Sequence, residues 1–218
     1  MQRWKNFLVG LAVAWKLSGL ACAVPVLTVP GGAGNTGPTG TTVGWEFLTT
    51  GDLSVTSFGY FDANFDGLRS SHEVGIWNSG GVLLGSAIVP SGTAGTPINN
   101  FRFVAVAPIF LAAGQIYRIG GFSDTSTPPN FDDLKISTFP TFIGPITIVS
   151  GTRAKTSAVA GFSDPVNDLL GAGNGAFGPN FEFILGGGGA PEMSGHWAAS
   201  LACIGLLLSL AESRRNRV

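Results

Sequence analysis

Short runs of apolar and aromatic residues, separated by Gly, Pro, Asn and Thr, recur along the central part of the chain. Within residues 101–106 the side chains alternate, so that Phe101, Phe103 and Ala105 fall on one face, as in a β-strand. Eight such runs cover residues 45–47, 53–61, 74–77, 83–89, 101–106, 116–122, 146–150 and 181–185. Because turn residues separate them and no helical period links them, the runs predict an all-β protein, an antiparallel β-sandwich of jelly-roll-like type.

The composition favours the same class of fold. The 33 Gly and 13 Pro in 218 residues supply many turn positions and leave little room for long helices. Between the third and fourth runs, Asn78-Ser79-Gly80-Gly81 predicts a hairpin turn, because Asn and Gly tolerate the positive φ that tight turns need.

The first 23 residues have the layout of a secretory signal. Arg3 and Lys5 precede an apolar segment over residues 7–15, and Ala21-Cys22-Ala23 has the small residues of a cleavage site. We therefore expect a signal helix over residues 1–23, with cleavage after Ala23. The alternative is a lipoprotein modified at Cys22, although Gly19 stands where a lipobox has a branched apolar residue.

The C-terminal segment, residues 186–218, has three parts: a Gly-rich linker with Pro191 and Glu192, an apolar run over residues 197–211, and an Arg-rich end. We expect a transmembrane helix with the arginines in the cytoplasm and the body, residues 24–185, outside that membrane. A plain buried helix is the alternative. The arginines are Arg214, Arg215 and Arg217.

The order of these tail features resembles the PEP-CTERM sorting signal of Gram-negative bacteria. The resemblance rests on Pro191, Glu192, the apolar run and the terminal arginines; Met193 stands where the family pattern has a second Pro. The segment Phe177-Gly178-Pro179-Asn180-Phe181-Glu182-Phe183 is similar to the strand that often precedes such tails. The resemblance implies recognition by an exosortase-like processing enzyme. The body would first be held in the periplasm and then passed to the cell surface or extracellular matrix.

Residues 41–122 also resemble a β-sandwich domain of unknown function found in exported bacterial proteins. The matching pieces occur in order at Gly44-Trp45-Glu46-Phe47, Gly59-Tyr60-Phe61-Asp62, Asp66-Gly67-Leu68, Ser71-His72-Glu73-Val74-Gly75-Ile76-Trp77, Leu111-Ala112-Ala113-Gly114 and Tyr117. This resemblance implies a fold and a compartment, and no reaction.

Charge limits the partners of the body. Six basic and 11 acidic residues lie between residues 24 and 189, a formal net charge of −5. An acidic body argues against nucleic acid, because phosphate binding needs a basic face. The body contains no cysteine, so it has no disulfide framework.

One loop carries the spacing of a calcium site. Asp62, Asn64 and Asp66 alternate before Gly67, and Glu73 follows after five residues. Alternate oxygens would turn inward, the glycine would permit the bend, and the glutamate would close the shell. The predicted ligands of a bound Ca²⁺ are therefore Asp62, Asn64, Asp66 and Glu73. The alternative is a polar loop in which these side chains cap their own backbone.

The residues that catalysis would need are sparse. His72 is the single histidine of the body, and it lacks a recognisable nucleophile motif around it. A second group of acids follows a short recurrence, Gly121-Phe122-Ser123-Asp124 and Gly161-Phe162-Ser163-Asp164, and includes Asp132, Asp133 and Asp168. Paired carboxylates suggest a glycosidase, but the sequence does not give their separation. We expect no enzyme activity.

The function predicted from these patterns is that of an exported, non-catalytic surface or extracellular-matrix protein, sorted or anchored through its tail. The alternative is a carbohydrate-binding module for envelope or matrix polysaccharide. The two differ in where Trp45 and Trp77 lie: a structural domain would bury both, whereas a binding module would present one ring on an open face. Tyr60 and Tyr117 are the other candidates for stacking on sugars.

Overall fold

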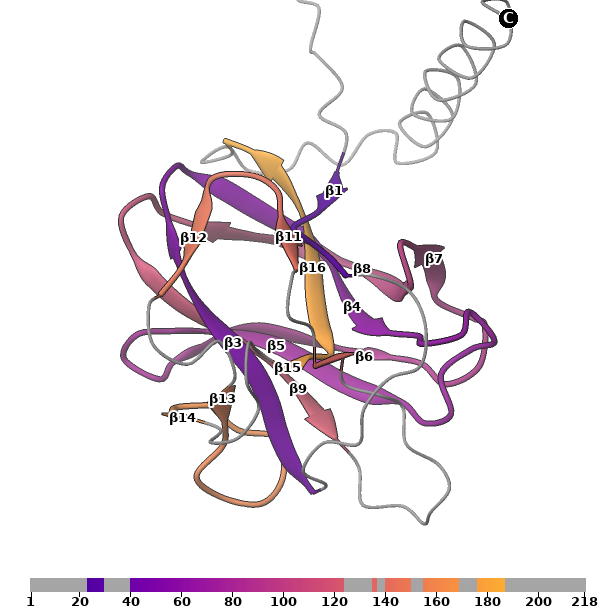
Figure 1. Ribbon diagram of the computed structural model, residues 1–218. Helices are drawn as coiled ribbons and strands as arrows, with labels where there is room; N and C mark the ends of the chain where they lie inside the picture. The colour runs from indigo at the N-terminus through magenta and orange to yellow at the C-terminus, as the bar shows by residue number, and fades with distance from the viewer. Residues whose placement is uncertain are drawn as a thin grey trace, which may run out of the picture. The chain divides into compact units, whose positions relative to one another are not determined.

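A computed structural model of the chain describes residues 23–29, 40–123, 135–136, 140–149, 155–168 and 176–186, all within one unit, Cys22–His196. Every element assigned in these residues is a β-strand, and the named strands pair in antiparallel fashion (Figure 1). The predicted all-β class is therefore confirmed. No helix among the described residues is long and apolar enough to span a membrane. The predicted signal and tail helices lie outside these residues.

The strands form two main sheets. The first has the order β1 (Val24–Pro25), β16 (Pro179–Leu185), β4 (Leu53–Phe61), β8 (Phe101–Leu111) and β7 (Thr96–Ile98). The second has the order β14 (Asn167–Asp168), β13 (Lys155–Thr156), β3 (Thr41–Thr49), β9 (Ile116–Ser123), β5 (His72–Asn78) and β6 (Leu83–Val89), with β12 (Ile146–Ile148) also paired to β3. Two small pairs join β10 (Lys135–Ile136) to β15 (Ala176–Phe177) and β11 (Thr141–Phe142) to β2 (Leu27–Thr28).

The chain passes repeatedly between these sheets. It runs from β3 in the seven-stranded sheet to β4 in the five-stranded sheet, returns for β5 and β6, crosses for β7 and β8, and returns for β9. The hairpin between β5 and β6 is the one that the sequence predicts: Asn78 and Val82 share a backbone hydrogen bond of 3.0 Å, and Gly81 has φ +81°. Each predicted run overlaps a strand, although β3 and β8 extend beyond their runs.

Aromatic side chains from both sheets meet in one core. Trp45 on β3 stacks on Phe181 of β16 with ring centroids 6.1 Å apart, and Phe47 lies 5.4 Å from the same ring. The indole Nε1 of Trp45 donates a 3.0 Å hydrogen bond to the carbonyl of Pro179. Since all three rings are fully buried, this cluster fixes the two sheets against each other.

The first described segment runs from the five-stranded sheet to the small pair of β2 and β11. Val24–Pro25 pairs with β16, and Leu27–Thr28 pairs with β11. Between these pairings, the buried side chain of Asn180 accepts from the Leu27 N–H at 3.2 Å and donates to its carbonyl at 2.8 Å. The amide of Asn180 therefore takes the place of a neighbouring strand and satisfies a buried backbone.

Candidate functional site

The loop predicted to bind calcium begins where β4 ends, and Asp62 anchors it. Its buried carboxylate accepts from the Gly67 N–H, with the Oδ2 contact at 3.1 Å. Gly67 has φ +104°, and a Cβ there would lie 2.8 Å from the Gly92 backbone, so the position requires glycine. The bend assigned to Gly67 from the sequence is present.

Arg102 on β8 reaches into this loop. Its Nε donates to Asp62 Oδ2 at 2.7 Å, and both side chains are buried, 6% and 2% exposed. The guanidinium also donates to the carbonyl of Phe65 at 3.2 Å and lies 5.9 Å from the centroid of the Phe65 ring. Further contacts of 3.5 Å reach the carbonyls of Thr93 and Gly95. A guanidinium therefore supplies positive charge to the loop oxygens.

The other predicted calcium ligands lie elsewhere on the loop and on β5. Asn64 and Asp66 are exposed at its tip. Glu73 lies on β5, where its Oε1 accepts from the Ser86 hydroxyl at 3.0 Å. Within the described ranges, no three or more His, Cys, Asp or Glu side chains are grouped to hold a metal. The calcium site stays a prediction, and an ion bound to Asp62 would compete with Arg102.

His72 is held in the core at the start of β5. Its ring is 2% exposed and stacks on Tyr60 of β4, with centroids 3.7 Å apart and planes 3° from parallel. Nδ1 lies 2.9 Å from the carbonyl oxygen of Phe122. Because a carbonyl only accepts, Nδ1 carries the hydrogen of this bond. These contacts give the ring a structural role between β4, β5 and β9.

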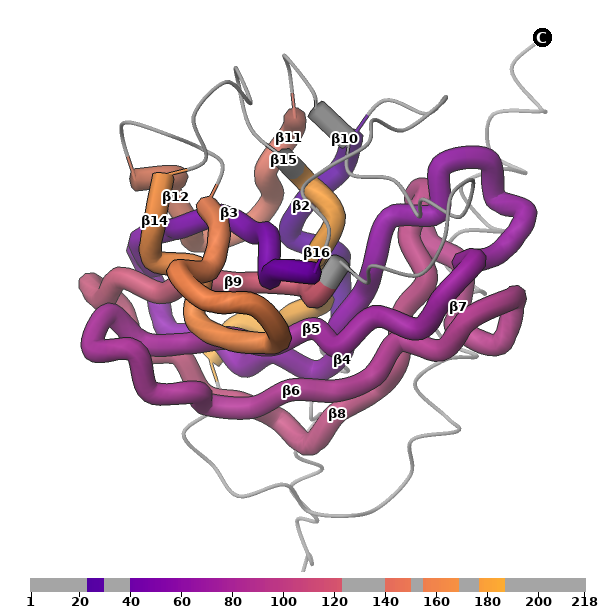
Figure 2. The backbone as a smooth tube through the Cα atoms, turned by 90° about the horizontal axis from the view of Figure 1, so that it is seen from below, coloured from indigo at the N-terminus to yellow at the C-terminus, as the bar shows by residue number. Residues whose placement is uncertain are grey.

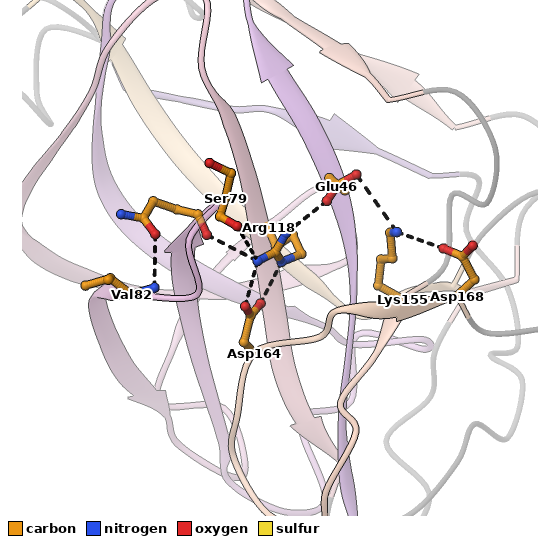
Figure 3. Close-up of polar contacts among 8 residues, drawn as sticks. Glu46, Ser79, Val82, Arg118, Lys155, Asp164 and Asp168 are labelled. Carbon is orange, nitrogen blue, oxygen red and sulfur yellow. Dashed lines mark hydrogen bonds and ion pairs between the residues drawn. The ribbon is translucent and has the colours of Figure 1, made fainter.

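A second charged cluster lies on the seven-stranded sheet around Arg118 of β9 (Figure 3). Nε and Nη2 of Arg118 donate to the two carboxylate oxygens of Asp164, each at 2.7 Å. Nη1 donates to Glu46 at 3.1 Å, and Nη2 also meets the carbonyls of Asn78 and Ser79 at 3.3 Å. The hydrogen bonding of Arg118 to the Asp164 carboxylate is the main cause that raises the pKa of Arg118, against the lowering effect of burial.

The cluster continues to the edge of the sheet. Glu46 also faces Lys155 of β13, with 3.9 Å between Oε1 and Nζ. The same Nζ binds Asp168 of β14 at 2.7 Å. Asp164 and Asp168, which belong to the acidic group considered for glycoside hydrolysis, are thus both paired with cations. Asp124, Asp132 and Asp133 lie outside the described residues.

The segment carrying Asp164, residues 161–166, crosses the outer face of the seven-stranded sheet. Gly120 of β9 and Gly75 of β5 are paired neighbours in that sheet. A Cβ on Gly75 would lie 2.9 Å from the Phe162 ring, and one on Gly120 would lie 3.0 Å from the Pro165 ring. These two glycines therefore give this crossing segment room to lie close to the sheet.

The crossing segment covers one of the two tryptophans whose exposure separates the predicted functions. Phe162 packs on Trp77 with ring centroids 5.0 Å apart, which leaves Trp77 3% exposed, and Trp45 is fully buried in the core. Tyr60 and Tyr117 are buried too, and the Tyr117 hydroxyl accepts from the Ala112 N–H at 3.0 Å. None of these four rings presents an open face for a sugar.

The sequence patterns did not identify Arg102 and Arg118, the two arginines that form the central ion pairs of these clusters. The available signal was the alternation of each strand, because Arg102 lies between two core phenylalanines and Arg118 between Tyr117 and Ile119. A charged residue inside an otherwise apolar strand suggests a buried or covered partner. In comparisons with known proteins, the chain matches no protein-family model and no curated protein.

Proposed function

We propose that this chain is an exported, non-catalytic surface or extracellular-matrix protein. The burial of Trp45 and Trp77 supports this proposal most strongly, because a binding module for polysaccharide would leave one ring open. The charged groups point the same way: the carboxylates of Asp62 and Asp164 are held by arginines, and His72 is stacked in the core. These side chains hold strands and loops together.

The proposal includes a jelly-roll-like β-sandwich for residues 24–185, a cleavable signal at residues 1–23 and a sorting tail at residues 186–218. The two antiparallel sheets around one core support the sandwich. The signal and the tail rest on the sequence alone: the signal on Arg3, Lys5 and Ala21-Cys22-Ala23, and the tail on Pro191, Glu192, Arg214, Arg215 and Arg217. The proposed partners are the membrane, an exosortase-like processing enzyme and extracellular polysaccharide.

Fractionation of cells tests the proposed destination. The full chain, tagged in the exposed hairpin turn at Ser79, is expressed in a Gram-negative host with and without an exosortase. We expect membrane-bound protein without the enzyme and surface or released protein with it. The double variant Pro191→Ala and Glu192→Ala should stay in the membrane, whereas the control Glu212→Gln should behave as the unchanged chain. Protein found in the cytoplasm in every case would refute export.

Calcium in the loop of Asp62, Asn64, Asp66 and Glu73 is a separate proposal, and the spacing of oxygen ligands supports it. Calcium should raise the melting temperature of the purified chain, and magnesium should not. Asp66→Asn should weaken the effect, because this exposed carboxylate is a ligand in the proposal. A melting temperature and a calorimetric trace that calcium leaves unchanged would end the calcium hypothesis.

A further inference from the structure

The open edge of the seven-stranded sheet is β6, the last strand in its order among the described residues. Its seven residues, Leu-Leu-Gly-Ser-Ala-Ile-Val, include no proline and no charge. Leu83 and Leu84 are exposed by 43% and 36%, and Ile88 by 63%. A long apolar edge of this kind is a template on which another strand can pair.

The other open edges of the two main sheets, within the described part of the chain, are short or contain proline or charge, and β12 is short, with three residues. β1 and β14 have two residues each, with Pro25 in the first and Asp168 in the second. β7 has three residues and contains Pro97, and the part of β8 that β7 leaves uncovered contains Pro108. Short length, proline and charge are the usual means of blocking edge pairing, and β6 has none of them.

Charge and sequence around β6 favour a second copy of this chain as the partner. Residues 74–101 contain no charged side chain and no histidine, although the body has a net charge of −5. Two acidic copies therefore meet here without placing like charges opposite each other. Glu73 pairs with Ile88 one strand inward, so the two copies of its carboxylate would be three strand spacings and four residues apart, about 20 Å, which is more than a physiological Debye length.

The strand is also complementary to itself. When two copies of β6 run antiparallel about an axis through Ser86, Leu84 lies opposite Ile88 of the second copy, and Gly85 lies opposite Ala87. Gly85 is already close to β8, since a Cβ there would lie 2.6 Å from Ile109 Cδ1. The tube view shows β6 beside β8 (Figure 2), so the apolar edge is backed by the other sheet.

We propose that two copies of this chain associate through β6, as antiparallel strands centred on Ser86, and so join two seven-stranded sheets into one. The interface is isologous, with the same residues contributed by each copy. It pairs backbone groups along the strand and covers Leu84 and Ile88. The proposal concerns the body and holds whether or not the tail is sorted as proposed above.

Disulfide trapping tests the position of the axis. The full chain carrying Cys22→Ser and Cys203→Ser is purified in mild detergent, with one new cysteine at position 86. Opposite residues of antiparallel strands have Cα atoms about 4.5–5.5 Å apart, within the range of a disulfide. Ser86→Cys should therefore give a covalent dimer on mild oxidation. The control Ser79→Cys, exposed on the hairpin turn and far from the axis, should stay monomeric.

A charge exchange in the Ser86→Cys background tests the register. Leu84→Lys with Ile88→Lys should reduce cross-linking about tenfold, because like charges then face each other. Leu84→Lys with Ile88→Glu should restore it, since each lysine faces a glutamate. The double-lysine variant makes the net charge of the body less negative. Long-range repulsion alone would therefore favour association of this variant, which is opposite to our expectation. Both positions are exposed, and thermal unfolding checks that each variant is folded.

Two results would overturn the proposal. One is a folded Ser86→Cys chain that gives no more covalent dimer than Ser79→Cys. The other is equal cross-linking by the two charge pairs, which would exclude the Leu84–Ile88 register. Raising the salt concentration should increase the dimer fraction of the unchanged chain, because the repulsion between acidic bodies is screened while the neutral strand contact is not. A dimer that salt dissociates would instead indicate an ionic interface.

Discussion

A single buried arginine, Arg102, supplies the positive charge that the carboxylate of Asp62 would otherwise obtain from solvent or a metal ion. Arg102 is fixed by Asp62 and by the Phe65 carbonyl, and its burial means that neither charge is well hydrated. A buried ion pair adds little net stability over an apolar pair, but loss of one partner leaves an uncompensated charge. The structural importance of Asp62 therefore depends on Arg102.

Removal of this arginine should be costly. Arg102→Met keeps most of the side-chain length but leaves the buried carboxylate of Asp62 without a cation. We therefore expect a loss of about 3–5 kcal/mol in the free energy of unfolding. The double variant with Asp62→Asn should recover part of that loss, because no charge is then buried. Denaturant unfolding measures both. A single variant as stable as the unchanged chain would show that water reaches Asp62.

Glu182 on β16 predicts a pH dependence. Burial raises the pKa of its carboxyl, opposed by a hydrogen bond from Ser57. Because the pKa of Glu182 is higher in the folded state than in the unfolded state, the protonated carboxyl contributes fully to folding stability below about pH 4.5, the unfolded value. This contribution is lost as pH rises through the folded pKa. Glu182→Gln should therefore be more stable than the unchanged chain at pH 7, with the difference disappearing near pH 4. Urea unfolding across this range measures it, and a constant difference would contradict the assignment.

At the scale of elements, the crossing segment shows how a loop is held against the outer face of a β-sheet. Gly75 on β5 and Gly120 on β9 leave the outer face of the sheet without side chains at two neighbouring positions, and Phe162 and Pro165 occupy the space. Asp164 then binds Arg118 with two hydrogen bonds, a geometry that fixes orientation as well as distance. The segment closes the outer face over Trp77.

Two aspartates on the same part of the chain allow a matched comparison. Asp164→Ala should cost about 1.5–3 kcal/mol and expose Trp77, because the hydrogen bonds that the charged Arg118 donates to Asp164 are lost in a covered site. Asp168→Ala should cost less than about 1 kcal/mol, since this carboxylate is half exposed, at 52%, where ion pairs contribute little. Unfolding and tryptophan fluorescence separate the two. Equal effects would mean that the segment is held by Phe162 and Pro165 alone.

The positions of the strands could be predicted from the sequence better than the side-chain ion pairs between them. Short apolar or aromatic runs bounded by turn residues predicted all eight strand segments, and alternation of the side chains supported the run at residues 101–106, because both signals are local in the sequence. The short strands β1 and β2 carry two residues each, too few for a pattern. The pairs Asp62–Arg102 and Arg118–Asp164 span 40 and 46 residues, and a separation of that kind is fixed by the fold. The spacing of the predicted calcium ligands can be read within the loop sequence. The contact of Arg102 with this loop cannot, because Arg102 lies 40 residues from Asp62.

At the scale of the whole molecule, the two ends of the body meet. β16 is paired on one side with β4 and on the other with β1, so the strand formed last along the chain completes a sheet that begins with Val24. Contacts of such separation make folding slow relative to local structure. The sheet cannot be completed before residue 185 is available.

Asn180 is the side chain on which this closure depends most directly. It lies 153 residues from Leu27 and satisfies both the N–H and the carbonyl of that buried residue. Asn180→Ala should leave two buried backbone groups without these partners, at about 1–3 kcal/mol for each. The exposed Asn64→Ala serves as control and should change stability by less than about 0.5 kcal/mol. Amide hydrogen exchange of residues 24–29 should accelerate in the first variant alone. If exchange there stays slow, the strand pairings of Val24–Pro25 and Leu27–Thr28 hold the segment without the amide.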